Sequence, residues 1–225
     1  MPVCKGILGV PHFIHDDETG QDGVNGERGL MLAELNHRSK NIMQSVAASL
    51  SLMASRSKSG EAREVLKGAA ARMRAMAEAY AILYRGMGEV VPVRAYLQRL
   101  CAALLQMADG REISIRVSGA NPTWPEEVAS DIGMIVSEAV LNSLKHGFAA
   151  GGAGVIEVGL HEGPSGWVLT VQDDGDGYDS GGARRGLGTD LVEAFAHHLS
   201  GTAEWVSAPG DGTQLRVSFP APGAA

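Results

Sequence analysis

The segment Glu34-Leu-Asn-His-Arg-Ser-Lys-Asn41 lies inside a longer stretch, Leu30 to Met53, whose pattern decides the first part of the fold. Positions 32, 35, 39, 42, 46, 49 and 53 follow one another by three or four residues, which is the spacing of a helical packing seam. His37 falls between two seam positions and is expected on the far side of the helix. The stretch therefore predicts a helix with one packing face and one face that carries a histidine.

The histidine face combines four kinds of polar side chain. Glu34 precedes His37 by three residues, and Lys40 and Asn41 follow it by three and four, while Arg38 is its direct neighbour. These offsets place a carboxylate, an imidazole, an ammonium and an amide side by side. Such a pattern alone is also typical of a solvated helix surface that happens to hold a histidine. The remainder of the chain has to separate these two interpretations.

Composition narrows the class of protein. The chain has 225 residues with 44% hydrophobic content and a net charge of -7, which fits a globular protein of one or two domains. No basic patch indicates a nucleic-acid partner, and no apolar run is long enough for a membrane span. Cys4 and Cys101 form neither a metal pattern nor a disulfide framework, and the N-terminus lacks a signal pattern. We therefore expect a cytoplasmic protein.

The first part of the chain is expected to be an arm followed by a helical hairpin. Residues 1–27 are predicted to be a poorly ordered arm, and residues 28–88 to hold two helices, at about 30–55 and 61–85. The second helix repeats apolar positions by three and four, from Ala62 through Met73 to Leu83. Two such helices form an antiparallel hairpin with little to pack against. Its seam is therefore expected to meet a second hairpin, giving a four-helix bundle in a homodimer.

A second domain, residues 89–225, mixes helices with strands that alternate apolar and polar residues. Antiparallel strand pairs combined with helices predict an α/β sandwich, so the whole chain is α+β. The glycine-rich segment 173–188 is predicted to be a loop. Helices are expected at about 93–107, 126–146 and 189–199, and strands at about 113–117, 155–160, 167–172, 202–207 and 213–219.

Three clusters in the second domain suit one shared ligand, and the first lies on the predicted helix 126–146. Glu138 and Asn142 are four residues apart on one helical face. Oxygen donors on one face suit Mg²⁺, which prefers hard ligands. Lys145 and His146 at the helix end are placed to reach phosphate. An ordinary helix surface would show the same residues, so this cluster is not specific alone.

The other two clusters are rich in glycine. Asp173 follows a strand, where a carboxylate can accept a hydrogen bond from a base amine, and Gly175 and Gly177 allow backbone to approach a flat ligand. Gly186 and Gly188 precede a helix, whose first N–H groups favour phosphate. Each pattern alone is weak, since aspartate–glycine runs usually form turns. The order and spacing of the three clusters together are far more specific.

In that order and spacing, the second domain resembles the ATP-binding module shared by gyrase, Hsp90, histidine kinases and MutL, with its asparagine box and two glycine boxes. Thr213, in Gly210-Asp-Gly-Thr213, resembles the threonine that supports the adenine-binding aspartate. The first domain resembles the dimerisation and phosphoacceptor hairpin of a histidine-kinase class whose box reads Leu-Asn-His-Arg-x-Lys-Asn, here Leu35-Asn-His-Arg-Ser-Lys-Asn41. The resemblance covers about residues 30–220.

The resemblance implies a two-component histidine kinase that uses ATP and Mg²⁺. His37 would take the phosphoryl group and pass it to an aspartate of a response regulator, and Asn142 with Glu138 would hold the metal. Many histidine kinases have an acidic residue directly after the histidine, but Arg38 stands there, so Glu34 is the expected base. The Trp-x-Glu signature of the HWE group is not found at Trp167 or Trp205, which favours its non-HWE sister branch.

Two other functions fit parts of the pattern. A histidine phosphotransfer hub would have a degenerate second domain that does not bind ATP, but the expected asparagine, aspartate and glycines are present. An ATPase or serine kinase of the same module, such as an anti-sigma factor, would need neither His37 nor the hairpin.

A hinge near residues 86–92 and a lid at 177–188 are expected. The input signal is expected from the short arm, a sensory partner protein or a separate chain.

Overall fold

The computed structural model describes residues 19–84, 90–108, 110–148, 152–179 and 186–223, with side chains from Arg38 onward except that of Tyr84. Residues 36–225 form one compact unit that includes the hairpin contacts and the sheet. Three expectations fall wholly or partly outside the described residues: most of the arm at 1–27, the hinge at 86–92 and the centre of the lid at 177–188.

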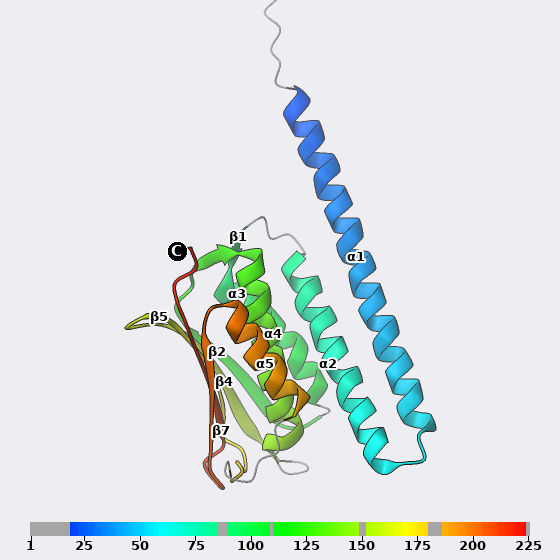
Figure 1. Cartoon of the computed structure of the whole chain (residues 1–225), viewed down its shortest axis with the longest axis vertical. Helices are drawn as coiled ribbons and strands as arrows, with labels where there is room; N and C mark the ends of the chain where they lie inside the picture. Colours follow the sequence, from blue (N-terminus) through cyan, green and yellow to red (C-terminus); the bar gives the residue numbers. More distant parts are fainter. Residues whose placement is uncertain (1–18, 85–89, 109, 149–151, 180–185, 224–225) are drawn as a thin grey trace, which may run out of the picture. The chain divides into compact units, whose positions relative to one another are not determined.

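Two long helices precede a domain of mixed helices and strands (Figure 1). The main sheet has the order β2-β4-β5-β7-β6, with β2 parallel to β4 and every other pair antiparallel. A separate two-stranded sheet joins β1 to β3. The elements are α1 (Thr19–Arg56), α2 (Gly60–Tyr84), β1 (Val90–Pro92), α3 (Val93–Leu105), a 3₁₀ turn (Gln106–Ala108), β2 (Ile113–Gly119), β3 (Thr123–Pro125), α4 (Glu126–Asn142), a π turn (Ser143–Gly147), β4 (Gly154–Gly163), β5 (Gly166–Asp173), α5 (Leu187–His198), β6 (Thr202–Ser207) and β7 (Thr213–Phe219).

One face of the main sheet packs against α3, α4 and α5 (Figure 1). The strands supply alternate apolar side chains to this layer, as a half-buried sheet requires. The apolar stripe of α4 belongs to the core. The predicted α/β sandwich is confirmed. Buried members of the stripe and of the strands are Ile132, Ile135, Val136, Ala139, Val140, Ile156, Val158, Leu160, Leu169, Val171, Leu215 and Val217.

Helix α2 packs against α4 and α3 and belongs to the core of the second domain. Ala75 and Ala79 are fully buried there, and their small side chains let the helices approach closely. Gly133 on α4 leaves room for Tyr96 of α3, whose hydroxyl donates to the carbonyl of Ala79 at 3.5 Å. The second helix of the hairpin is therefore a structural part of the domain that follows it.

The packing seams of the hairpin have two different fates. On α1, Ile42 is 63% exposed and Met53 is 57% exposed, so the described part of the chain does not cover the seam at these positions. On α2, Leu83 is 1% exposed and Met76 packs against the same core. The expectation that this end of the α2 seam meets a second hairpin is wrong, because the chain's own α3 and α4 cover it.

Several elements differ from the sequence-based expectation. Helix α1 begins at Thr19 instead of about Leu30, although four glycines precede Leu30. Extending an existing helix costs less than starting one, so glycines near its end do not stop it. Strands β1 and β3 were not predicted, since each is only three residues long and borders or contains proline. The helix expected to reach His146 changes at Ser143 into a π turn.

Candidate functional site

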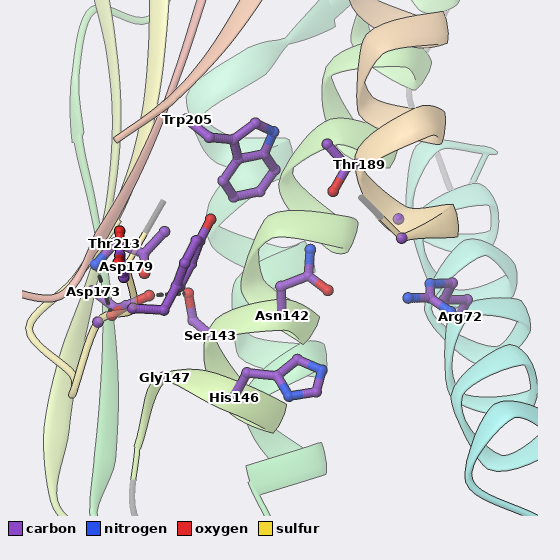
Figure 2. A pocket seen from close by; sticks show the side chains of 14 residues that line it. Arg72, Asn142, Ser143, His146, Gly147, Asp173, Asp179, Thr189, Trp205 and Thr213 are labelled. Carbon is purple, nitrogen blue, oxygen red and sulfur yellow. Dashed lines mark hydrogen bonds between the residues drawn. The ribbon is translucent and has the colours of Figure 1, made fainter. Parts of the chain in front are cut away.

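A cavity of about 610 Å³ lies between α4, α5, the end of β5 and the loop after it. It brings together members of all three predicted clusters, and Figure 2 shows Asn142 and His146 of the first cluster and Asp173 of the second. Gly177, Gly186, Gly188 and Thr213, all predicted site residues, also line it. The residues that line it without having been predicted are Arg72, Ser143, Gly147, Tyr178, Asp179, Thr189 and Trp205.

Asp173 is the buried carboxylate of this cavity, with 2% of its surface exposed. Its Oδ1 accepts the backbone N–H groups of Gly175 and Thr213, both at 3.1 Å, and its Oδ2 accepts the Ser143 hydroxyl at 2.6 Å. A carboxylate offers about four lone-pair positions. The three bonds thus fix the orientation of the group and leave it one acceptor position, which suits an amine donor in the cavity.

The π turn explains how Ser143 reaches Asp173. An extra residue in one helical turn rotates the following side chains, and such turns are frequent at functional sites. The turn ends at Gly147, where a Cβ atom would lie 3.2 Å from the carboxylate of Asp173. The Gly147 carbonyl accepts the backbone N–H of Asp176 at 2.6 Å. The missing side chain of Gly147 therefore keeps the space beside the carboxylate open.

Thr213 supports the site through its backbone and its side chain. Besides the bond to Asp173, its Oγ1 lies 3.0 Å from the hydroxyl of Ser207, which accepts the backbone N–H of Tyr178 at 3.0 Å. The preceding Gly212 has a φ of +72°, and a Cβ there would collide with the carbonyl of Asp173. The start of β7 is thus fitted to the end of β5.

Trp205 forms an apolar wall of the cavity (Figure 2). Its Nε1 is buried and has no hydrogen-bond partner among the described residues. Tyr178 also lines the cavity, and the pKa of its phenol is raised by partial burial and by the charge of Asp173. Flat aromatic groups beside a fixed carboxylate are suited to a planar heterocycle with an amine substituent.

The opposite end of the cavity contains a buried ion pair. Arg72 of α2 donates from Nε to Oε2 of Glu138 at 2.8 Å, and the Glu138 side chain is 2% exposed. The pKa of Glu138 is raised above its ordinary value, because the effect of burial exceeds the opposing effect of the nearby Arg72 guanidinium. Glu138 does not line the cavity itself, whereas Arg72 and Asn142 do. Removing one partner of such a pair costs about 3–5 kcal/mol, so the pair ties α2 to α4.

The two basic residues at the end of the α4 segment differ in position. His146 lines the cavity, and its pKa is lowered by partial burial and by the charges of Lys145 and Arg72. Lys145 instead lines a neighbouring hollow of about 200 Å³, together with Arg72 and Asn142. The two hollows therefore share Arg72 and Asn142 as a common wall.

The predicted hairpin residues lie on α1, and none of them is among the described residues that line the cavity. The side chains of Glu34 and His37 lie outside the described residues. Arg38 and Asn41 are exposed, and Lys40 forms an ion pair with Glu78 of α2 at 3.3 Å. Asn41 also borders a shallow apolar groove formed with Ile42 and its neighbours on α1.

Ser143 and Arg72 could hardly be recognised as site residues from the sequence. Ser143 follows the predicted Asn142, but its role depends on the π turn, which has no clear sequence signal. Arg72 lies on the hairpin, 66 residues before its partner Glu138. A basic residue within the alanine-rich part of α2 was the one available hint. Trp205 was visible in the predicted strand 202–207 but not assigned to the site.

The domain has a mixed sheet with helices on one face, and its cavity is bounded by Asn142 at the end of α4 and by glycine-rich loops. This combination defines an ATP-binding domain of the gyrase and histidine-kinase kind. A family model described as "Histidine kinase-, DNA gyrase B-, and HSP90-like ATPase" matches residues 127–223. A second, HisKA_2, described as "Histidine kinase", matches residues 34–108. The chain therefore belongs to the histidine kinases of the HisKA_2 type.

Known relatives agree with this family. Blue-light-activated histidine kinase 2 of Erythrobacter litoralis is 28% identical over 232 residues, covering 96% of this chain and 64% of that protein. Sensor histidine kinase PdtaS of Mycobacterium tuberculosis is 30% identical over 155 residues, covering 67% of this chain and 30% of its own length. The chain thus spans less than two thirds of either relative.

Solved structures agree on the fold. The histidine kinase domain of the blue-light-activated kinase of Erythrobacter litoralis superposes with a TM-score of 0.61 at 24% identity, covering 80% of this chain and 95% of that one. Within the described part of the chain, no helix combines the length and apolar character needed to span a membrane.

Proposed function

We propose that this protein transfers the γ-phosphoryl group of ATP to His37 and then passes it to an aspartate of a response regulator. The observation that carries this proposal is Asp173, a buried carboxylate held by three donors with one acceptor position left for an amine in the cavity. The adenine of ATP presents such an amine on a planar ring. A site for ATP and a histidine box in one chain are the two parts that a histidine kinase requires.

The acceptor chemistry follows from the residues of the box. A neutral imidazole nitrogen of His37 attacks the γ-phosphorus, a nitrogen–phosphorus bond forms, and the bond to the ADP oxygen breaks. Glu34, one helical turn before it, takes or orients the ring proton. Arg38, Lys40 and Asn41 complete the box. His37 on α1 and the γ-phosphate in the cavity must approach each other for transfer.

Asn142 fits a magnesium ion, because it offers an amide oxygen at the wall of the cavity. Glu138, the second predicted ligand, does not line the cavity and is paired with Arg72, so it does not fit this role. Mg²⁺ is commonly held by one or two protein oxygens, substrate phosphates and waters. When bound, the ion offsets charge on the phosphates. Asn142 would hold it, and the first turn of α5 with Gly186 and Gly188 would face the phosphates.

Labelling with γ-³²P-ATP tests this function. The full chain is expected to take up label that is lost in acid and retained in base, as a phosphohistidine requires. His37→Gln should fold and bind ATP normally, but take no label and pass none to a receiver domain. His161→Gln, at an exposed position on β4, is the matched control and should label normally. Labelling retained in His37→Gln would contradict the assignment, and ATP binding without labelling of the parent would favour a phosphotransfer hub.

A further inference from the structure

The cavity receives one side chain from outside the catalytic domain. Arg72 lies on α2, the second helix of the hairpin, and lines the cavity together with residues of α4, α5 and the β5 loop. Figure 2 shows it on the side of Asn142 away from Asp173. Its side chain is 21% exposed, so it is neither a free surface group nor a core group. The hairpin thus contributes directly to the wall of the site.

Arg72 is held in one orientation. Its Nε donates to Glu138, and this is the one hydrogen bond that the guanidinium makes among the described residues. The terminal nitrogens Nη1 and Nη2 are left with four N–H groups. A Cβ on Gly188 would lie 3.2 Å from Nη2 and 3.4 Å from Nδ2 of Asn142. The free end of the guanidinium therefore lies beside Asn142 and the first turn of α5.

The charge of the cavity points to a use for these N–H groups. Arg72 is the one lysine or arginine among the described residues that line the cavity, while Asp173 and Asp179 contribute carboxylates. The polyphosphate of ATP carries several negative charges and needs cations close to it. A planar guanidinium with two free nitrogens binds phosphate oxygens in a bidentate manner.

We infer that Arg72 binds the polyphosphate of ATP, with Glu138 as the positioning residue that orients the guanidinium. This inference rests on the proposed ATP site and adds a ligand to it that comes from the hairpin. A contact shared by α2 and the nucleotide makes the packing of α2 against α4 and nucleotide binding favour each other.

The test compares ATP with adenosine, which lacks phosphates, by calorimetry on the full chain in EDTA so that no metal contributes. Removing Arg72 alone would leave Glu138 buried and unpaired, so the variants are Glu138→Gln and the double variant Arg72→Gln with Glu138→Gln. The double variant should bind ATP about tenfold or more weakly than Glu138→Gln. Adenosine should bind both variants equally.

Arg74→Gln is the matched control. Arg74 lies two residues after Arg72 on α2, donates to Ser51 of α1 and does not line the cavity. It should bind ATP as the parent does. Equal ATP affinity in Glu138→Gln and the double variant would overturn the inference, as would an equal loss for adenosine, which indicates a purely structural role. A parent that binds neither ligand would instead overturn the proposed function, and this inference with it.

Discussion

At the scale of single residues, Asp173 shows how one side chain acquires specificity. Its bonds come from Ser143 after α4, from Gly175 just after β5 and from Thr213 at the start of β7. These bonds hold an acceptor facing the cavity before any ligand arrives. A group that is already oriented loses little entropy on binding, so its hydrogen bond favours the correct partner strongly.

Replacing Asp173 with asparagine tests that specificity. The amide can still accept the N–H groups of Gly175 and Thr213, so the domain should fold. It presents an NH₂ group where the carboxylate had its second acceptor oxygen, and an adenine amine then meets a donor. We expect ATP affinity to fall at least about a hundredfold by calorimetry.

Asp176→Asn is the control for this substitution. Asp176 belongs to the same aspartate–glycine run, but its side chain is exposed and does not line the cavity. ATP affinity in this variant should match the parent. Unchanged affinity in Asp173→Asn would remove the adenine assignment.

At the scale of elements, α2 belongs to two parts of the molecule. Arg74 and Glu78 contact α1, whereas Ala75, Ala79 and Leu83 join the core formed by α3 and α4. A helix with two packed faces cannot move relative to one neighbour without changing its fit to the other. We therefore expect the hairpin and the catalytic domain to unfold together.

Leu83→Ala tests this cooperativity. Leu83 is 1% exposed, and truncating a buried leucine costs about 2–5 kcal/mol. The melting temperature of the whole compact unit should fall by about 5–15 °C in calorimetry, as a single transition. Val65→Ala, on the same helix at a position that is 66% exposed, should change stability by less than about 0.5 kcal/mol. Two separate transitions would show that α2 is not part of the domain core.

The elements also show which parts of the fold can be predicted from sequence. Strands β6 and β7 were predicted with the bounds observed, because Thr202–Ser207 and Thr213–Phe219 alternate clearly and are separated by a glycine-rich turn. A shared ligand was predicted for Asp173, Asn142 and Gly188, and the structure shows that all three line one cavity. The start of α1 and the π turn could not be predicted, since helix propagation and tertiary packing override local propensity there.

At the scale of the whole molecule, the α1 seam is an apolar surface that the described residues do not cover. Ile42, Val46 and Met53 are 63%, 40% and 57% exposed, and Ile42 and Val46 border a shallow groove. Their spacing is that of a helical seam. We propose that a second copy of the hairpin covers it in a homodimer.

Arg72 belongs to this scale too, because its contact with Glu138 depends on the fold of the entire chain and no local pattern predicts it.

Ile42→Asp tests the homodimer. The substitution changes an exposed position in the single chain, so monomer stability should change little. In the dimer it would bury an unpaired carboxylate in each copy, which costs several kcal/mol. Light scattering across a concentration series should show at least about a hundredfold weaker association. Gln44→Asp, an exposed position on the other side of α1, should associate normally. A parent that stays monomeric at every concentration would contradict the dimer.

The place of β7 in the sheet affects how the protein is made. β7 is the last strand along the chain, yet it lies between β5 and β6 and supplies the Thr213 N–H to Asp173. During synthesis on the ribosome, β5 and β6 emerge before β7, so this part of the sheet cannot form until β7 is available. The nascent chain has an incomplete nucleotide site until β7 leaves the exit tunnel. Cellular ATP can therefore stabilise the domain only after translation of this strand is complete.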